Sequence, residues 1–284
     1  MADVSKAVLI TGCSSGIGWA TAERMARRGW TVYATARRPE SIARLAERGC
    51  RTLALDVTDE ESMRAAVQAV EDQEGAVGAL VNNAGYSQSG AVETVPLDDV
   101  RRQFETNVFG LVRMCQLVLP GMRRQGYGRI VNVSSMGGRM TFPGGGFYHA
   151  TKYAVEALSD ALRFEVAGFG VGVAIIEPGL IRTEFGNVAA SSVEATGEGD
   201  APYATFNATV AQTTKAAYEA GLISRFGAGP NAVARTIEKA ISARRPRPRY
   251  KVTASARIVL GLRRLLPDRA WDLFLRGQFP QPGA

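Results

Sequence analysis

The sequence predicts one α/β domain: a doubly wound, Rossmann-type parallel sheet with helices on both faces. Three observations predict it. Short apolar segments alternate with helix-like segments between residues 7 and 176. The strand-like segments lack the alternation of apolar and polar residues that half-exposed strands show, which indicates a sheet buried on both faces. A glycine-rich turn joins the first strand to the first helix, as it does in doubly wound folds.

Seven strands are expected, each a short run of apolar residues. They lie at 7–10, 31–35, 52–55, 79–81, 129–133 and 172–176, with an edge strand at 250–253. Pro178 and Gly179 end the sixth strand, because proline cannot donate to the ladder and both residues favour turns.

Helices are expected at 17–28, 39–49, from residue 58 onward, and at 97–124, 148–167 and 231–243. Gly29 is a C-terminal stop for the first helix, and Pro39 suits the first turn of the second. The third opens with a capping-box pattern from Thr58 to Glu61. In the fourth, apolar residues recur at helical spacing over 100–111, so one unbroken helix is predicted.

Composition supports one large core and excludes several classes of protein. The chain has 284 residues, 46% of them hydrophobic. Cys13, Cys50 and Cys115 are odd in number and lack metal-ligand spacing, which is typical of reduced thiols in a cytoplasmic protein. The first residues lead directly into a strand, leaving no room for a signal peptide, and no apolar run reaches the ~18 residues of a membrane span. We therefore expect a cytoplasmic location.

The chain divides into a main domain over residues 1–253 and a C-terminal extension over 254–284. Within the main domain, residues 184–229 are rich in small residues with scattered aromatics, too long for a turn, and suit a lid over a substrate. The net charge of +7 is concentrated in residues 244–284, where ten Arg and Lys stand against two Asp. Because this tail lacks interleaved aromatics or a known motif, a solvated surface is favoured over nucleic-acid binding.

The tail has a second interpretation. Apolar and arginine positions mix over 258–275 as in an interfacial helix, so peripheral contact with an anionic membrane is one hypothesis. Packing over the substrate cleft or against a partner subunit is the alternative, and both stay open.

Tyr148 and Lys152 are four residues apart in a predicted helix and so share one face. A phenol titrates near pH 10 in water, and an adjacent ammonium favours its phenolate. Such a pair is a candidate proton donor to a carbonyl, or acceptor from an alcohol, near neutral pH. The spacing alone is a weak signal, because it also arises by chance.

Two further patterns indicate a bound dinucleotide. The turn from Gly12 to Gly18 offers helix N–H groups and two serine hydroxyls to a pyrophosphate, although its glycine spacing differs from the common Rossmann fingerprint and a merely tight turn is the alternative. Arg37 and Arg38 follow the second strand where an acid would bind a ribose hydroxyl, which favours NADP(H) over NAD(H). Asp56, after the third strand, is expected near the adenine or as a turn acid.

Taken together, the motifs resemble those of the short-chain dehydrogenases/reductases over residues 5–183. The motifs that carry the resemblance are Thr11-Gly12-x-x-x-Gly16-x-Gly18, Asn82-Asn83-Ala84-Gly85, Asn107, Ser134-Ser135, Tyr148-x-x-x-Lys152 and Pro178-Gly179-x-x-x-Thr183. The glycine loop and the segment 32–37 look most like the branch that contains 17β-hydroxysteroid and retinol dehydrogenases.

The resemblance implies a role for each matching residue. Tyr148 would be the general acid/base, Lys152 would assist it and bind the nicotinamide ribose, and Ser135, with Ser134 as the alternative, would hold the substrate oxygen. Asn107 would organise a water; a polar Asn inside a helix also independently suggests a partner. The implied cofactor contacts are Gly12, Ser14, Ser15, Gly16, Ile17, Gly18, Arg37, Asp56, Val57, Asn83, Gly85, Tyr148, Lys152, Pro178, Gly179, Ile181 and Thr183.

We therefore expect an NADP(H)-dependent oxidoreductase that interconverts a carbonyl and an alcohol on an apolar steroid, retinoid or long-chain substrate. A 3-oxoacyl-thioester reductase and a non-catalytic cofactor-sensing scaffold are the alternatives. No metal site is expected, and His149 is assigned a surface or supporting role. The resemblance also implies a homodimer or homotetramer formed through the helices at 97–124 and 148–167.

Overall fold

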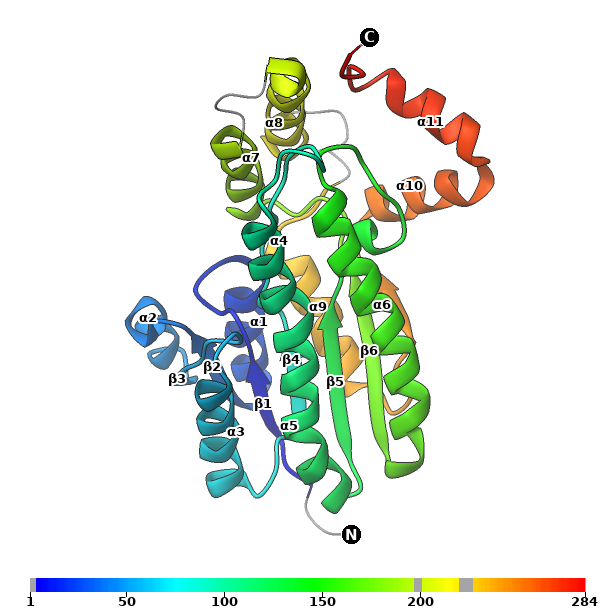
Figure 1. The fold of residues 1–284 in the computed structure, drawn as a ribbon. Helices are drawn as coiled ribbons and strands as arrows, with labels where there is room; N and C mark the ends of the chain where they lie inside the picture. Colours follow the sequence, from blue (N-terminus) through cyan, green and yellow to red (C-terminus); the bar gives the residue numbers. More distant parts are fainter. Residues whose placement is uncertain (1–3, 197–200, 220–226, 284) are drawn as a thin grey trace.

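A computed structural model describes residues 4–196, 201–219 and 227–283, and its centre is a seven-stranded, fully parallel sheet (Figure 1). The strand order is β3-β2-β1-β4-β5-β6-β7, so the winding direction reverses between β1 and β4. The strands are β1 (Ala7–Ile10), β2 (Thr31–Ala36), β3 (Arg51–Ala54), β4 (Ala79–Asn82), β5 (Gly128–Val133), β6 (Val171–Glu177) and β7 (Arg249–Lys251). The predicted doubly wound fold is confirmed.

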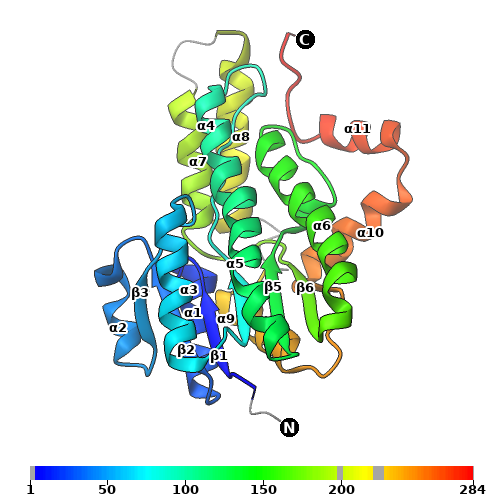
Figure 2. The ribbon, with the colours of Figure 1, turned by 60° about the horizontal axis from the view of Figure 1, so that its bottom comes forward.

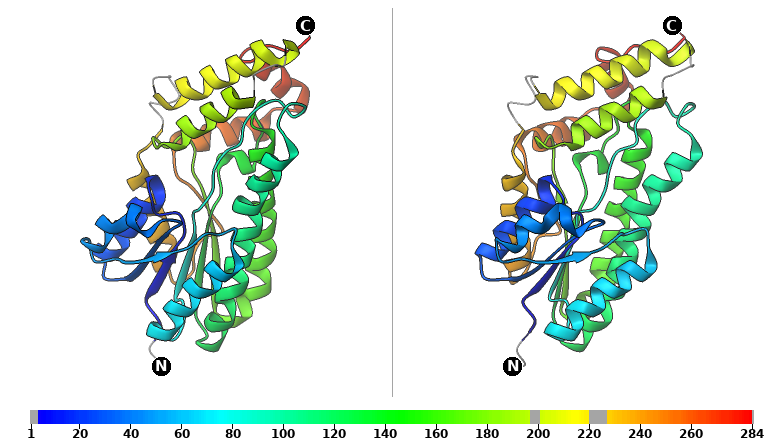
Figure 3. Two further views of the ribbon diagram at one scale, coloured as in Figure 1. Left: turned by 60° about the vertical axis from the view of Figure 1, so that its left-hand side comes forward. Right: turned by 90° about the vertical axis from the view of Figure 1, so that its left-hand side faces the viewer.

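Helices cover both faces of the sheet, as the two turned views show (Figures 2 and 3). One layer consists of α1 (Gly16–Arg27), α2 (Ala43–Ala46) and α9 (Pro230–Ser242), and the other of α3 (Glu60–Glu74), α5 (Gly110–Arg124) and α6 (Gly146–Val166). Two apolar cores result, one on each side of the sheet. All four residues of β1 are fully buried between them, which explains why the strand lacks polar alternation.

Three predicted helices differ in detail. Residues 39–49 form a 3₁₀ turn (Pro39–Ile42) followed by the single turn of α2, so the longer helix predicted there was wrong. The cap of α3 is Asp59, whose carboxylate accepts hydrogen bonds from two main-chain N–H groups of the first turn, in place of Thr58. The helix expected over 97–124 is α4 (Leu97–Phe104), a π-helical turn (Glu105–Phe109) and α5.

Two helices that we call the cap helices follow β6: α7 (Phe185–Thr196) and α8 (Ala204–Glu219). They lie side by side across the carboxyl ends of the strands, at the top of Figures 1 and 3. Phe206 and Val210 of α8 pack against Val193 of α7 and against Ala91. The cap helices occupy most of the segment 184–229; its residues 197–200 and 220–226 lie outside the described residues.

The C-terminal extension forms α10 (Ala254–Leu265) and α11 (Asp268–Arg276). Leu260 and Trp271 bury their side chains against Met140, and the Trp271 ring lies 6.0 Å from that of Phe142. The extension therefore packs on the loop that leads into α6. Among the described helices, none combines the length and apolarity needed to span a bilayer.

Candidate active site

A cleft of about 900 Å³ opens at the carboxyl edge of the sheet, where the strand order reverses. Doubly wound folds bind their ligands at this position. Of the site residues predicted from the sequence, all but Gly18 and Asn107 line the cleft. The fold therefore gathers residues from the whole first two-thirds of the chain into one space.

The glycine-rich turn is shaped so that no side chain fits at its first position. Gly12 has φ +71°, and a Cβ on it would lie 2.9 Å from the Cα of Ala84. The hydroxyl of Thr11 accepts hydrogen bonds from the main-chain N–H groups of Asn83 and Ala84, both at 3.0 Å. The turn between β1 and α1 is thus locked to the loop after β4, with the N-terminus of α1 beside the cleft.

Gly18 and Asn83 hold this turn in shape. A Cβ on Gly18 would lie 2.2 Å from the carbonyl oxygen of Gly12, so helix α1 approaches the turn too closely for any larger residue. The amide of Asn83 donates to the carbonyl oxygens of Thr11 and Gly12 at 3.0 and 2.9 Å. Gly18 therefore supports the cleft from behind, while Asn83 both supports it and lines it.

Basic residues line the end of the cleft formed by β2 and β3. Arg37 and Arg38 lie there, as predicted, and Arg102 of α4 joins them. Asp56 lines the same end and also accepts two hydrogen bonds from Thr58, at 2.9 and 2.8 Å. Asp56 therefore both stabilises the turn after β3 and lines the cleft, so it combines the two positions that the sequence left open.

Several lining residues were missed by the sequence reasoning. Tyr86 and Gln88 come from the loop after β4, while Arg102, Glu105 and Thr106 come from α4 and the π-helical turn. Burial raises the pKa of Tyr86, and the guanidiniums of Arg102 and Arg37 oppose that rise. Helical periodicity over 97–124 identifies the apolar face that packs on the sheet. It does not indicate which residues of the polar face line a cleft.

At the other end of the cleft, α6 presents Tyr148 and Lys152. The ammonium Nζ of Lys152 donates to the carbonyl oxygen of Val133 at 3.0 Å and lies 5.7 Å from the centroid of the Tyr148 ring. Burial lowers the pKa of Lys152 to about 8, and the nearby Glu156 carboxylate opposes that fall. The Tyr148 ring packs 5.4 Å from the ring of Phe185 on α7, so a cap helix borders the pair directly.

Ser135 lines the same cleft as this pair. Its hydroxyl oxygen accepts a hydrogen bond from the N–H of Gly137 at 3.0 Å, which caps a short 3₁₀ turn (Met136–Gly138). Because that contact uses an oxygen lone pair, the hydroxyl hydrogen is left to donate to another group. Ser134 also lines the cleft but is 3% exposed, less accessible than Ser135.

Asn107 is buried behind the cleft at the centre of the π-helical turn. Its side-chain oxygen accepts from the N–H of Tyr86 at 3.1 Å, and its amide donates to the Tyr86 carbonyl and the Thr151 hydroxyl at 2.9 and 3.1 Å. The partner expected for a polar residue inside a helix is therefore present. π-Helical turns inside helices occur frequently at functional sites.

His149 is buried, so the surface alternative predicted for it was wrong. One ring nitrogen, Nδ1, lies 2.9 Å from the Gly137 carbonyl oxygen, and the other, Nε2, accepts from the N–H of Phe142 at 3.2 Å. These contacts require a neutral ring with its hydrogen on Nδ1. His149 thus ties the loop 137–142 to α6, which agrees with the supporting role.

Comparison with known proteins agrees with this geometry. Residues 6–194 match the family model described as short chain dehydrogenase. The chain is 37% identical over 275 residues to the uncharacterized oxidoreductase YbbO of Escherichia coli, covering 96% of this chain and 95% of that protein. It is 36% identical over 275 residues to the NADPH-dependent 3-dehydrocapnine reductase of Ornithobacterium rhinotracheale, covering 93% and 94% respectively.

A solved structure shows the same fold. The crystal structure of a short-chain dehydrogenase from Streptomyces avermitilis matches with a TM-score of 0.77 and 34% identity, covering 97% of this chain and 99% of that one. The family model spans the glycine-rich turn, the sheet up to β6 and helix α6. This chain therefore belongs to the short-chain dehydrogenase/reductase family, oxidoreductases that act on CH–OH groups with nicotinamide cofactors.

Proposed function

We propose that this protein is an NADP(H)-dependent oxidoreductase that interconverts a carbonyl and an alcohol on an apolar substrate, with Tyr148 as general acid/base. The observation that carries the proposal is the composition of one cleft. One end holds Tyr148, Lys152 and Ser135, and the other holds the glycine-rich turn and a group of guanidiniums. A dinucleotide that spans the cleft would bring its reactive end to the tyrosine.

The chemistry assigned to each side chain follows from its contacts. The nicotinamide cofactor, when bound, supplies or accepts hydride. Tyr148 donates the proton to the carbonyl oxygen or accepts it from the alcohol, and the Lys152 ammonium stabilises the resulting phenolate. Ser135 donates its hydroxyl hydrogen to the substrate oxygen as negative charge develops there. Each group stands at the same end of the cleft, which supports this division of roles.

Asn107 and Lys152 approach a common point behind Tyr148. A Cβ on Gly85 would lie 3.0 Å from the Asn107 side-chain oxygen and 3.7 Å from Lys152 Nζ. Glycine at position 85 therefore leaves a narrow space between an amide and an ammonium. We assign this space to the proton-relaying water that the family resemblance implies, with Asn107 and Lys152 as its partners.

The residues present fit a phosphorylated dinucleotide. Gly12 and Gly16 adopt positive φ in a turn whose backbone lines the cleft, and the N-terminus of α1 offers its positive dipole end to a pyrophosphate. Arg37, Arg38 and Arg102 surround the opposite end of the cleft and suit a 2′-phosphate. A relative that is named as NADPH-dependent supports the same preference.

The substrate side of the cleft is apolar. Phe185 and Val188 of α7 line it beside Tyr148, and we assign the cap helices the role of the substrate lid. A 3-oxoacyl thioester carries a charged arm that needs basic residues at this end, whereas the arginines lie at the other. A relative named for reduction of a 3-dehydro compound supports a ketone as the substrate of this chain too.

The test is consumption of NADPH and of NADH by the full chain with a panel of carbonyl compounds. The panel holds a long-chain 3-oxo amphiphile, a steroid ketone, retinal and a 3-oxoacyl thioester. Turnover of one of the first three with NADPH, lost in Tyr148→Phe, is the expected result. NADPH binding without turnover of any compound would overturn the proposal in favour of the cofactor-sensing alternative, and preference for the thioester would favour the reductase alternative.

We also propose that the protein assembles as a homodimer or homotetramer through α5 and α6. Large apolar side chains project from α6 and from the π-helical turn that leads into α5: Phe109 is 55%, Leu158 41% and Phe164 89% exposed. Exposed apolar patches on helices mark contact surfaces. A second copy of the chain would cover these side chains.

The outer face of the C-terminal helices suits an anionic membrane surface. Leu265 and Leu273 are 82% and 70% exposed, and the exposed Arg257, Arg264 and Arg269 belong to the same two helices. Apolar side chains combined with arginines favour the boundary between lipid headgroups and acyl chains. We therefore propose peripheral membrane contact through this face, while the inner face packs on the loop before α6.

A further inference from the structure

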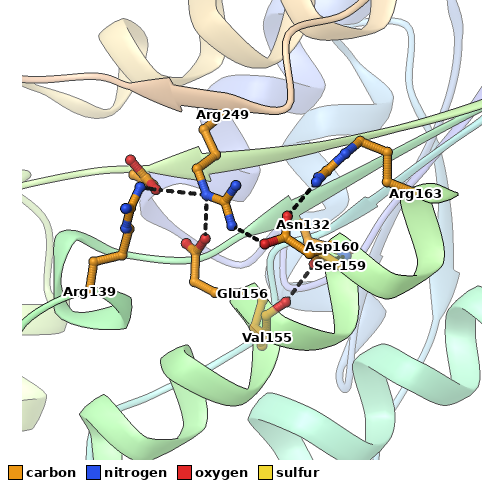
Figure 4. Close-up of polar contacts among 9 residues, drawn as sticks. Asn132, Arg139, Val155, Glu156, Ser159, Asp160, Arg163 and Arg249 are labelled. Carbon is orange, nitrogen blue, oxygen red and sulfur yellow. Dashed lines mark hydrogen bonds and ion pairs between the residues drawn. The ribbon is translucent and has the colours of Figure 1, made fainter.

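A cluster of charged side chains surrounds Arg249 and has no part in the chemistry above (Figure 4). Glu156 follows Lys152 by one helical turn on α6 and is 6% exposed. Glu177, the last residue of β6, is fully buried. Arg249, the first residue of β7, reaches both carboxylates.

Arg249 is shared among three carboxylates. Its Nε lies 2.9 Å from Oε2 of Glu156 and 3.4 Å from Oε1 of Glu177. Its Nη2 lies 2.5 Å from Oδ2 of Asp160, one turn further along α6. The three contacts tie the helix that bears the catalytic pair to the ends of two strands.

Other charged groups face the cluster more weakly. Arg139, with a side chain that is 48% exposed, lies 3.6 Å from Oε1 of Glu177. Arg163 pairs with Asp160 at 2.5 Å on the more exposed side of α6. Lys152, one turn before Glu156 on α6, also interacts with that carboxylate. Arg249 is thus the cation in closest contact with Glu156, and it also contacts Glu177.

Burying two carboxylates side by side is unfavourable unless a cation compensates them. Among the described residues, Oε1 of Glu156 and both oxygens of Glu177 accept no hydrogen bond within 3.5 Å. The Ser134 hydroxyl and Arg249 both lower the pKa of Glu156, whose burial raises it, so Arg249 is the main charged group that compensates this carboxylate. Loss of its guanidinium would leave uncompensated negative charge within one helical turn of Lys152.

The cluster is also connected to the cleft through the main chain that follows Glu177. Glu177 is followed by Pro178 and Gly179, which line the cleft. The Pro178 carbonyl accepts from the N–H of Met136 at 2.8 Å, and the Glu177 carbonyl accepts from the N–H of Val252 at 3.2 Å. A shift at Glu177 would therefore move Pro178 and Gly179, which are proposed to contact the cofactor.

We propose that Arg249 is a positioning residue for the proposed reaction: it clamps α6 to β6 and β7 and neutralises Glu156 and Glu177, so that the Lys152 ammonium dominates the field at Tyr148. The inference rests on the proposed function of the Tyr148–Lys152 pair. The charge pattern does not predict this role, because Arg249 lies in a run of basic residues that is interpreted as a solvated surface.

Titration of the Tyr148 phenol tests this without turnover. The ultraviolet absorbance of the phenolate is measured against pH for each variant and for the same variant carrying Tyr148→Phe, and the difference isolates Tyr148. Arg249→Met should raise the midpoint by roughly 0.5–1 pH unit, because uncompensated carboxylates disfavour the phenolate. Glu156→Gln should lower it by a similar amount, and the double variant should return close to wild type.

Two controls separate electrostatics from packing. Arg249→Lys keeps the charge and should retain most of the wild-type midpoint. Arg163→Met removes a guanidinium on α6 that forms its ion pair with the more exposed Asp160, and should leave the midpoint unchanged. If Arg249→Met does not fold, the lowered phenolate midpoint expected for Glu156→Gln still tests the inference.

Equal midpoints in Glu156→Gln and wild type, or shifts of the same sign in Arg249→Met and Glu156→Gln, would overturn the inference. Because the readout is the ionisation of Tyr148, it remains valid if the wild-type chain turns over none of the carbonyl compounds. That second result would count against the proposed function alone.

Discussion

Lys152 Nζ lies 5.7 Å from the centre of the Tyr148 ring and is held there by the Val133 carbonyl at 3.0 Å. The lysine is buried and the tyrosine is half-buried at the cleft, so water screens this interaction less than it would screen a pair at the surface. The carbonyl of β5 thus fixes the position of a charge that, in free solution, would move with its flexible side chain.

Replacing Tyr148 by Phe should reduce kcat by about 10²–10⁴-fold, because the proton donor is lost while the cleft keeps its shape. NADPH affinity, measured by fluorescence titration, should change little. Tyr153→Phe is the matched control: this tyrosine is on the same helix, is 45% exposed and lies outside the large cleft, so its variant should turn over normally. Equal loss of binding and turnover in Tyr148→Phe would contradict the assigned role.

Arg37→Ala should weaken the binding of NADPH much more than the binding of NADH. Removing one charge-assisted contact to a 2′-phosphate costs about 1.5–3 kcal/mol, which corresponds to a roughly 10–100-fold rise in KM for NADPH. KM for NADH should stay within about twofold, since NADH has no such phosphate. Arg44→Ala, on the exposed side of α2 and away from the cleft, serves as the control. A parallel rise for both cofactors would show that Arg37 does not distinguish between them.

His149 should make the fold sensitive to mild acid. Burial lowers the pKa of His149 below its ordinary value of 6.5. Above that pH the ring is neutral in both the folded and the unfolded chain, so its contribution to stability is complete. As the pH falls below 6.5, the unfolded chain binds a proton that the folded chain resists, and stability is lost progressively.

The measurement is direct because the chain has a single histidine. Its ring resonances, followed by NMR against pH, should give a midpoint below 6.5, and Tm should fall between about pH 6.5 and 5.5. The fall should be smaller in His149→Gln, which has no group that titrates there. A normal histidine midpoint would show that the ring is not held in the neutral form.

Phe164→Glu should shift the protein toward smaller assemblies. The side chain is 89% exposed on α6, so a charge there costs the isolated chain little and disrupts a contact made by a second copy. Light scattering after size exclusion measures the mass. Leu273→Glu, a comparable change on α11, should leave the mass unchanged. A wild-type protein that is already monomeric at micromolar concentration would rule out the proposed contact.

The sequence predicted those features that depend on local pattern. The strands were found because burial on both faces leaves a continuous apolar run, as in β1, and the turn at Gly12 because its backbone conformation and close contact with Ala84 exclude side chains. The π-helical turn around Asn107 could not be found, because one inserted residue barely alters the apolar spacing.

Residues that act through distant contacts were also missed. Arg102 reaches the cleft from the polar face of α4, and Arg249 meets Glu156 across 93 residues of sequence. His149 appears exposed by its position next to Tyr148, yet the loop at 137–142 folds over it. In each case the contact depends on how whole helices and strands pack together, and local periodicity in the sequence does not predict that packing.

The C-terminal helices should bind anionic vesicles at low salt. Vesicles containing phosphatidylserine should retain the full chain on sedimentation, neutral phosphatidylcholine vesicles should retain much less, and raising the salt should release it, because each arginine near the surface contributes about 1 kcal/mol. Replacing Leu265 and Leu273 together by Asp should abolish retention, whereas Phe164→Glu should not. Failure of the wild-type chain to bind at low salt would contradict the proposed membrane contact. It would favour a protein partner for the exposed apolar residues of α10 and α11.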